Sequence, residues 1–168
     1  IVVPSSWSPD EPLDYILDEY SRSKNKMKLI VTGDYRKQLK LFKKYRKNPR
    51  IVFTGYIRAD KYYALLSQAR AIIAATTREY TMLSAAWEAI AYCKPLIISY
   101  TKTIYELLGD YPEYFRPYVK GSLEKILRKL DNSMLKNLEK RINKINNALN
   151  VIIKRQINKL KKYIETID

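Results

Sequence analysis

One carboxylate lies in a stretch of the sequence that is otherwise apolar. Glu88 stands between the segments LSAAW and AIAY. Burying an ionised side chain without a partner is costly, so we expect Glu88 to have a function. On a helix, Ser84 and Tyr92 lie on the same side as Glu88, four residues before and after it. A carboxylate in this setting is suited to accept two hydrogen bonds from a ribose. The alternative is that it accepts hydrogen bonds from the protein's own backbone or from a buried arginine.

The residues just before Glu88 predict an anion site. We expect a helix over residues 82–93, with Thr81 as its cap. The first turn of this helix, Met82, Leu83 and Ser84, presents unpaired N–H groups and the positive end of the helix dipole. Such a helix end suits a diphosphate. Together with Glu88, about two turns deeper, it predicts a site for a ligand that carries both ribose and phosphate.

The elements that must position these residues alternate along the chain. Short apolar runs predict buried strands at residues 1–3, 28–31, 51–53, 71–74 and 95–98. Amphipathic segments predict helices at residues 11–22, 36–47, 59–69, 82–93 and 102–109. Strands that alternate with helices predict an α/β fold, a doubly wound (Rossmann-like) parallel sheet flanked by helices.

Two of the four glycines follow predicted strands within two residues. Gly33 and Gly55 would therefore lie at the carboxyl ends of parallel strands, where ligands bind in such sheets. A residue without a side chain lets a ligand approach the backbone. The alternative is that both are ordinary turn glycines.

The character of the chain changes near residue 130. We expect a nucleotide-binding domain over residues 1–130 and a long basic helix over residues 131–168. One apolar stripe shifts by one position along this helix, through Leu135, Leu138, Ile142, Ile145, Leu149, Ile152 and then Ile153, Ile157, Leu160, Ile164, Ile167. We expect the stripe to pack on a missing half of the protein or on a second copy. An anionic membrane surface is the alternative, because basic amphipathic helices bind there.

Composition excludes several classes of protein. The net charge of +15 favours an anionic partner, although the basic residues are scattered, as on any basic protein surface. Without histidine, these residues hold no Ser-His-Asp arrangement and no histidine zinc site, and we expect no metal. The lone Cys93 is expected to be a small core residue. Neither a G-x-G-x-x-G nor a Walker A loop is present, which disfavours dinucleotide oxidoreductases and P-loop enzymes.

The chain shows neither a signal-peptide pattern nor an apolar run of the roughly 20 residues that a membrane span needs. We therefore expect a cytoplasmic protein, with contact to the inner face of the membrane as a further option. The sequence begins Ile-Val-Val without a methionine. We interpret it as a piece of a longer protein.

Residues 71–106 resemble the donor-nucleotide-binding domain of GT-B glycosyltransferases, of the retaining family 4 or group 1 type. The family pattern carboxylate-Ala-x-Ala-x-x-Lys-Pro-hydrophobic-Ile is matched by residues 88–97, EAIAYCKPLI. The segments SPDEPLD, LIVTGD and IVFTGYI resemble further family segments, at residues 8–14, 29–34 and 51–57. The resemblance covers about residues 1–130.

The resemblance implies a glycosyltransferase that binds a nucleotide-diphosphate sugar without cofactor or metal. It would transfer the sugar, with retention, to a glycan or lipid-linked acceptor held by an N-terminal domain missing here. In the family, the second glutamate of an E-x7-E pair binds the ribose, which places Glu88 there. The diphosphate would lie at residues 81–84, Tyr56 and Ile57 would contact the base, and Gly33 would line the same crevice.

The sequence departs from the family pattern at the diphosphate. The first glutamate of the pair falls on Tyr80, and the family's Arg and Lys fall near Ser6 and Glu11. Arg78 and Lys102 are our candidates for the missing catalytic cations; the alternative is that both are surface cations. These departures leave a degenerate, non-catalytic scaffold as the second hypothesis. Charge-driven nucleic-acid binding is the third, and a sugar-nucleotide epimerase of similar fold is a further enzyme alternative.

Overall fold

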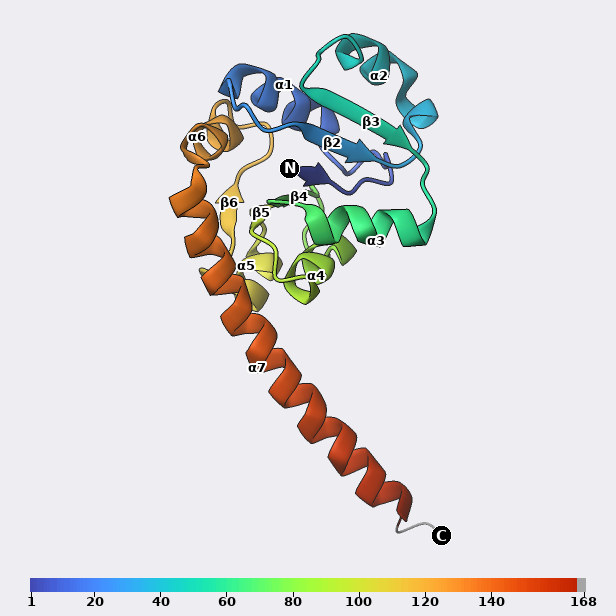
Figure 1. Cartoon of the computed structure of the whole chain (residues 1–168), viewed down its shortest axis with the longest axis vertical. Helices are drawn as coiled ribbons and strands as arrows, with labels where there is room; N and C mark the ends of the chain where they lie inside the picture. Colours follow the sequence, from blue (N-terminus) through green and yellow to red (C-terminus); the bar gives the residue numbers. More distant parts are fainter. Residues whose placement is uncertain (166–168) are drawn as a thin grey trace.

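The computed structural model describes residues 1–165, and side chains as far as residue 161. Its centre is a six-stranded sheet with the order β3-β2-β1-β4-β5-β6, in which every pair of neighbours is parallel (Figure 1). The strands are β1 (Val2–Val3), β2 (Leu29–Thr32), β3 (Ile51–Gly55), β4 (Ile72–Ala74), β5 (Leu96–Ser99) and β6 (Glu113–Phe115). The predicted doubly wound α/β fold is confirmed. The strand order reverses between β1 and β4, which is where such sheets bind ligands.

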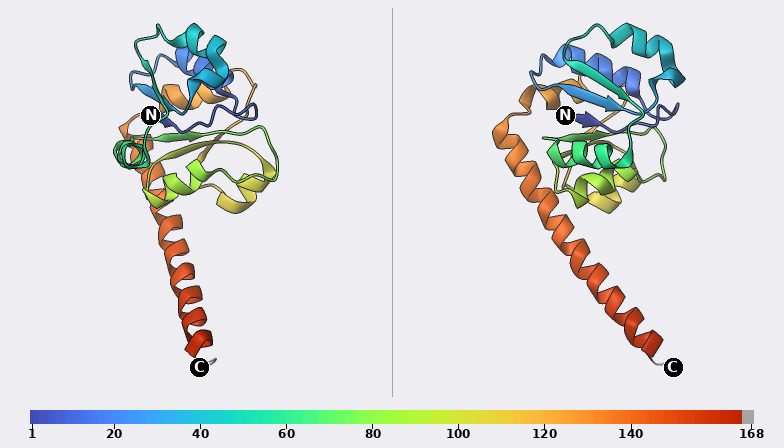
Figure 2. Two further views of the ribbon diagram at one scale, coloured as in Figure 1. Left: turned by 90° about the vertical axis from the view of Figure 1, so that its right-hand side faces the viewer. Right: turned by 45° about the vertical axis from the view of Figure 1, so that its right-hand side comes forward.

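Helices cover both faces of the sheet (Figures 1 and 2). They are α1 (Leu13–Ser23), the 3₁₀ helix η1 (Tyr35–Gln38), α2 (Leu39–Tyr45), α3 (Ala59–Gln68), α4 (Ser84–Ala91), α5 (Lys102–Leu108), α6 (Ser122–Lys129) and α7 (Asn132–Glu165). Neighbouring strand residues point to opposite cores: Val3 and Ile73 pack with α1 and α6, whereas Val2 and Ile72 pack with α3, α4 and α5. Burial on both faces explains why the strands are continuously apolar in sequence.

Two local predictions were wrong, and one strand was not predicted. The helix predicted at 82–93 begins at Ser84, with Leu83 as N-cap, so Thr81 does not cap it; its hydroxyl instead donates to the carbonyl of Glu79. The helix predicted at 36–47 is a 3₁₀ turn followed by α2. Strand β6 was missed because it lies at the sheet edge and its sequence, Glu-Tyr-Phe, is not an apolar run.

Helix α7 packs on the domain over its first half and then extends away from it (Figures 1 and 2). Leu135, Leu138 and Ile142 are buried, and Arg141 pairs with Glu113 of β6 at 2.6 Å. Ile145 and Leu149 are partly buried against the same core as Ile142. Five apolar residues further along are exposed, namely Val151, Ile152, Ile153, Ile157 and Leu160. The side chain of Ile164, and all of Ile167, lie outside the described residues. Among the residues described, no helix is both long and apolar enough to cross a membrane.

Cys93 was expected in the core, but the structure places it next to α7. It is only partly buried and has a positive φ of 53°. Its sulfur accepts a hydrogen bond from the Asn146 side chain of α7 at 3.0 Å. The thiol therefore belongs to the contact between α7 and the domain.

Candidate ligand-binding site

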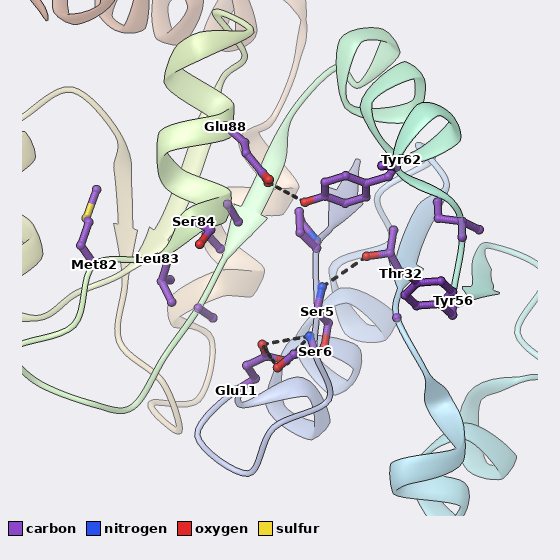
Figure 3. Close-up of a pocket in the computed structure, with 17 residues that line it drawn as sticks. Ser5, Ser6, Glu11, Thr32, Tyr56, Tyr62, Met82, Leu83, Ser84 and Glu88 are labelled. Atoms are coloured by element: carbon purple, nitrogen blue, oxygen red, sulfur yellow. Dashed lines mark hydrogen bonds between the residues drawn. The ribbon is translucent and has the colours of Figure 1, made fainter.

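A cavity of about 540 Å³ opens at the carboxyl end of the sheet, around the point where the strand order reverses (Figure 3). Its wall comes from the loop after β1, the ends of β2 and β4, the start of α3 and the start of α4. The lining residues are Pro4, Ser5, Ser6, Glu11, Thr32, Gly33, Tyr56, Ile57, Ala59, Tyr62, Ala74, Ala75, Met82, Leu83, Ser84, Ala85 and Glu88. The size suits a ligand of nucleotide dimensions.

Glu88 lies in the wall of this cavity and points towards α3 (Figure 3). The Tyr62 hydroxyl of α3 donates a hydrogen bond to its Oε2 at 2.5 Å. Burial raises the pKa of Tyr62 far above its usual value, and the hydrogen bond to Glu88 raises it further, so this hydroxyl stays a donor. Neither backbone N–H groups nor an arginine bind Glu88 among the residues described. No sequence pattern indicated a role for Tyr62, which shares a helix with Leu65 and Leu66 and resembles a core residue.

The fully buried carboxylate of Glu19 shows what complete internal pairing looks like in this fold. It accepts hydrogen bonds from the N–H groups of Gly121 and Glu124, at 2.9 Å each, and from Arg22. Burial raises the pKa of Glu19, but these bonds outweigh that effect and the pKa lies below its usual value. Glu88, with one tyrosine donor, keeps acceptor capacity for a ligand.

The start of α4 forms the next part of the wall. Met82 and Leu83 are half-buried beside the cavity, and Ser84 begins the helix there. Among the residues described, no side chain caps this helix end. The N–H groups of its first turn and the positive end of its dipole are therefore available to bind an anion in the cavity.

The opposite wall is the loop after β1, in which backbone and side-chain donors converge on Glu11 (Figure 3). The N–H groups of Ser6 and Trp7 donate to the carboxylate at 3.0 and 2.9 Å. The hydroxyls of Ser5 and Ser6 donate to it at 2.5 and 2.8 Å. Sequence comparison singled out Ser6 and Glu11 only as departures from a pattern, and the mutual contacts of this loop were not predicted.

The loop after β1 is held in place by β2. The indole N–H of Trp7 donates to the carbonyl of Thr32 at 2.8 Å, and the Thr32 hydroxyl accepts the N–H of Ser5 at 3.3 Å. Gly33 has a φ of 87°, and a side chain there would meet the Ser5 carbonyl. Close backbone contact thus fixes the loop against the end of the sheet.

Of the residues predicted at the carboxyl ends of the strands and near the base, three line the cavity and one lies behind its wall. Gly33, Tyr56 and Ile57 line the cavity. Gly55 lies behind it, where its carbonyl accepts the N–H of Gly33 at 3.1 Å. Tyr56 is largely exposed, which leaves its ring available to a ligand.

Four other predicted residues lie outside the cavity wall. Tyr80 is 90% exposed and, like Thr81, belongs to the loop before α4. Arg78 pairs with Asp10 at 3.5 Å, and Lys102 pairs with Glu106 at 3.7 Å. The structure therefore does not bring the two candidate cations to the cavity.

Glu79, which misses the family spacing by one residue, binds the start of α5. Its carboxylate accepts the N–H groups of Lys102 and Thr103 at 3.2 and 2.8 Å. The hydrogen bond from Thr103 lowers the pKa of Glu79. Glu79 thus serves as a cap for α5 and does not face the cavity.

The charge of the cavity wall differs from that of the whole chain. The chain carries a net charge of +15. The charged side chains that line the cavity are the two carboxylates Glu11 and Glu88, and no lysine or arginine occurs among the described lining residues. Anion binding here therefore depends on backbone N–H groups and hydroxyls.

Comparison with known proteins identifies relatives of this fold. The family model described as "Glycosyl transferases group 1" matches residues 1–132. No curated protein matches the sequence. Among solved structures, HepE from Anabaena in complex with UDP and glucose is 20% identical, with a TM-score of 0.76 over 96% of this chain and 48% of that chain.

Two further structures show the same fold. Sucrose-phosphate synthase from Thermosynechococcus elongatus is 16% identical, with a TM-score of 0.74 over 99% of this chain and 46% of that one. The C-terminal domain of a glycosyl transferase group 1 family protein (LpcC) from Francisella tularensis is 13% identical, with a TM-score of 0.74 over 88% of this chain and 84% of that one. The chain spans about half the length of HepE and of sucrose-phosphate synthase.

Proposed function

The chain belongs to the glycosyl transferases group 1 family, and we propose that it is the donor-binding half of a glycosyltransferase that uses a nucleotide-diphosphate sugar. The observation that carries this proposal is the position of Glu88, whose carboxylate faces a nucleotide-sized cavity and keeps acceptor capacity. HepE, which has this fold, is found in complex with UDP and with UDP-glucose.

The parts of the cavity correspond to the parts of such a donor. Glu88 accepts hydrogen bonds from the two ribose hydroxyls, and Tyr56 and Ile57 flank the base. The first turn of α4, at Ser84, holds the diphosphate by its N–H groups. Fixed donors at the diphosphate stabilise the charge that builds on the leaving group, and the same contacts orient the sugar.

The rest of the reaction lies beyond this chain. We propose that a second domain binds the glycan or lipid-linked acceptor and that transfer proceeds with retention. A retaining transfer needs no general base among the residues of this chain. Arg78, in the loop before α4, and Lys102, at the start of α5, are exposed, and they remain candidate cations only if these two segments approach the donor. Donor binding without a metal is part of the proposal, and no group of three or more potential metal-ligating side chains occurs among the described residues.

Calorimetry on the 168-residue chain tests the proposal. We expect UDP, GDP or ADP, or a sugar adduct of one of them, to bind with one-to-one stoichiometry. The affinity should be the same in Mg²⁺ and in EDTA. A folded chain without affinity for any of these nucleotides would contradict the proposal and favour the non-catalytic scaffold, which the acidic cavity wall also supports.

The exposed part of α7 supports peripheral contact with an anionic membrane. Val151, Ile152, Ile153, Ile157 and Leu160 are exposed there, and the same segment carries Lys154, Arg155, Lys159 and Lys161. A helix that combines apolar and basic faces binds to anionic lipid surfaces. We propose this contact as the role of the segment.

Vesicle flotation tests the role of α7. The chain should float with vesicles that contain phosphatidylglycerol and not with pure phosphatidylcholine, and Ile157→Glu together with Leu160→Glu should reduce the bound fraction several-fold. The matched control is Lys136→Gln with Lys140→Gln, which lowers the charge by the same two units at exposed positions on the first half of the helix. Equal flotation of wild type and all variants would contradict membrane contact. A dimer in sedimentation experiments that is lost in the Ile157/Leu160 variant would also contradict it, and would assign the apolar stripe to contact with a second copy.

A further inference from the structure

The loop after β1 is built as an anion site, and the chain fills it with its own carboxylate. The consecutive N–H groups of Ser6 and Trp7 converge on Glu11, and Trp7 has the left-handed φ of 61°. Consecutive N–H groups with a left-handed residue form a concavity that binds anions. The hydroxyls of Ser5 and Ser6 complete it, so the Glu11 carboxylate accepts hydrogen bonds from four donors, two N–H groups and two hydroxyls, on three residues.

This anion site faces the same cavity as Glu88 and the start of α4. Ser5, Ser6 and Glu11 all line that cavity. Within the described part of the chain, Glu11 is paired with no lysine or arginine; its bonds come from N–H and O–H groups. The carboxylate therefore occupies donors that a phosphate oxygen would use, and it adds a negative charge where the donor's phosphates would lie.

The loop after β1 is also held by contacts that do not involve Glu11. Trp7 and Ser5 are bonded to Thr32, and the Ser5 carbonyl packs on Gly33. The Lys37 ammonium donates to the carbonyl of Ser6 at 2.8 Å. None of these contacts involves the Glu11 carboxylate, so they can be kept when another anion takes its place.

We propose that Glu11 is an internal competitor for the phosphate groups of the donor: it fills the Ser5–Trp7 anion site while the cavity is empty and leaves it when a diphosphate binds. This inference rests on the proposed function, since it concerns the same cavity. It gives the loop after β1 a specific role in phosphate binding and makes Glu11 a determinant of donor affinity. Glu11 makes no bond in the reaction and acts through occupancy alone.

Titration with pyrophosphate, UDP and uridine tests the competitor role. Glu11→Gln removes the charge and should tighten pyrophosphate and UDP about tenfold or more, because a like charge next to a bound anion is costly. Uridine, which has no phosphate, should bind wild type and variant alike. Glu139→Gln, an equal charge change at an exposed position of α7, should leave all three affinities unchanged.

Amide NMR on the wild-type chain supplies a readout that needs no variant. Saturation with pyrophosphate or UDP should shift the Ser6 and Trp7 amide resonances, because their N–H groups exchange a carboxylate for a phosphate. Resonances that stay in place while ligand binds would overturn the inference. The inference is also wrong if folded Glu11→Gln binds UDP no more tightly than wild type does. It is equally wrong if wild type binds UDP only with Mg²⁺ and Glu11→Gln loses that binding.

The outcomes separate this inference from the proposed function. UDP that binds wild type and Glu11→Gln equally well supports a nucleotide site and overturns the competitor role. A second outcome is that pyrophosphate binds Glu11→Gln more tightly than wild type, while neither chain binds UDP, GDP, ADP or their sugar adducts. That outcome overturns the proposed function and still supports the anion site. Absence of all binding overturns both.

Discussion

Glu88→Ala should reduce the affinity for UDP, or for whichever nucleoside diphosphate binds, by about 30- to 1,000-fold while the chain stays folded. Two ribose hydroxyls lose a charged acceptor, and hydrogen bonds to charged groups contribute roughly 1.5–3 kcal/mol each. Two bonds that share one carboxylate contribute less than their sum, and a combined loss of about 2–4 kcal/mol corresponds to that range of affinity. Glu88 is only partly buried and has Tyr62 as its described partner, so its removal costs little stability. Calorimetry gives the affinity, and circular dichroism the fold.

Deoxynucleotides show whether the lost contact is the one to ribose. In wild type, 2′-deoxy and 3′-deoxy analogues should bind more weakly than the parent nucleotide. In Glu88→Ala this difference should vanish, because the coupling between residue and hydroxyl is gone. Tyr62→Phe removes only the internal donor and should change the affinity by a few-fold at most. If the deoxy penalty persists without Glu88, the carboxylate does not hold the ribose.

The part of the site that the sequence predicted is the part encoded by local pattern. Glu88 was found because a carboxylate within an apolar segment has to be explained, and Gly33 because it follows a strand. Both properties are visible within a few residues of chain. The same holds for the sheet, whose strands are doubly buried and therefore read as continuous apolar runs.

The missed residues depend on contacts between distant segments. Tyr62 meets Glu88 across 26 residues, and no local pattern distinguishes it from a core tyrosine. Glu11 meets Ser6 and Trp7 only because Trp7 adopts a positive φ, which a tryptophan seldom does. Thr81 was a reasonable cap by residue type, but the chain enters α4 through Leu83. Loop geometry, unlike strand pattern, is set by tertiary contact.

Gly33→Ala should destabilise the chain by about 3 kcal/mol or more, because two penalties act together. The residue has a φ of 87°, which costs an L-residue roughly 1–2 kcal/mol. A Cβ at this position would also lie 2.0 Å from the Ser5 carbonyl oxygen and 3.0 Å from the Trp7 ring. The obstacle is backbone, so relief requires the loop after β1 to move off β2. Urea unfolding, followed by circular dichroism, measures the free energy of unfolding.

Gly55→Ala separates the steric contact from the backbone conformation. Gly55 also has a positive φ, 69°, but a Cβ there would meet only the Tyr35 ring at an ordinary 3.5 Å. Gly55→Ala should therefore lower the free energy of unfolding only by the cost of the positive φ, about 1–2 kcal/mol. Equal decreases in the free energy of unfolding in Gly33→Ala and Gly55→Ala would show that the loop after β1 moves away from Gly33 at little cost. In that case the contact of Ser5 with Gly33 would not fix the loop, and the Ser6 and Trp7 N–H groups would not be held ready for an anion.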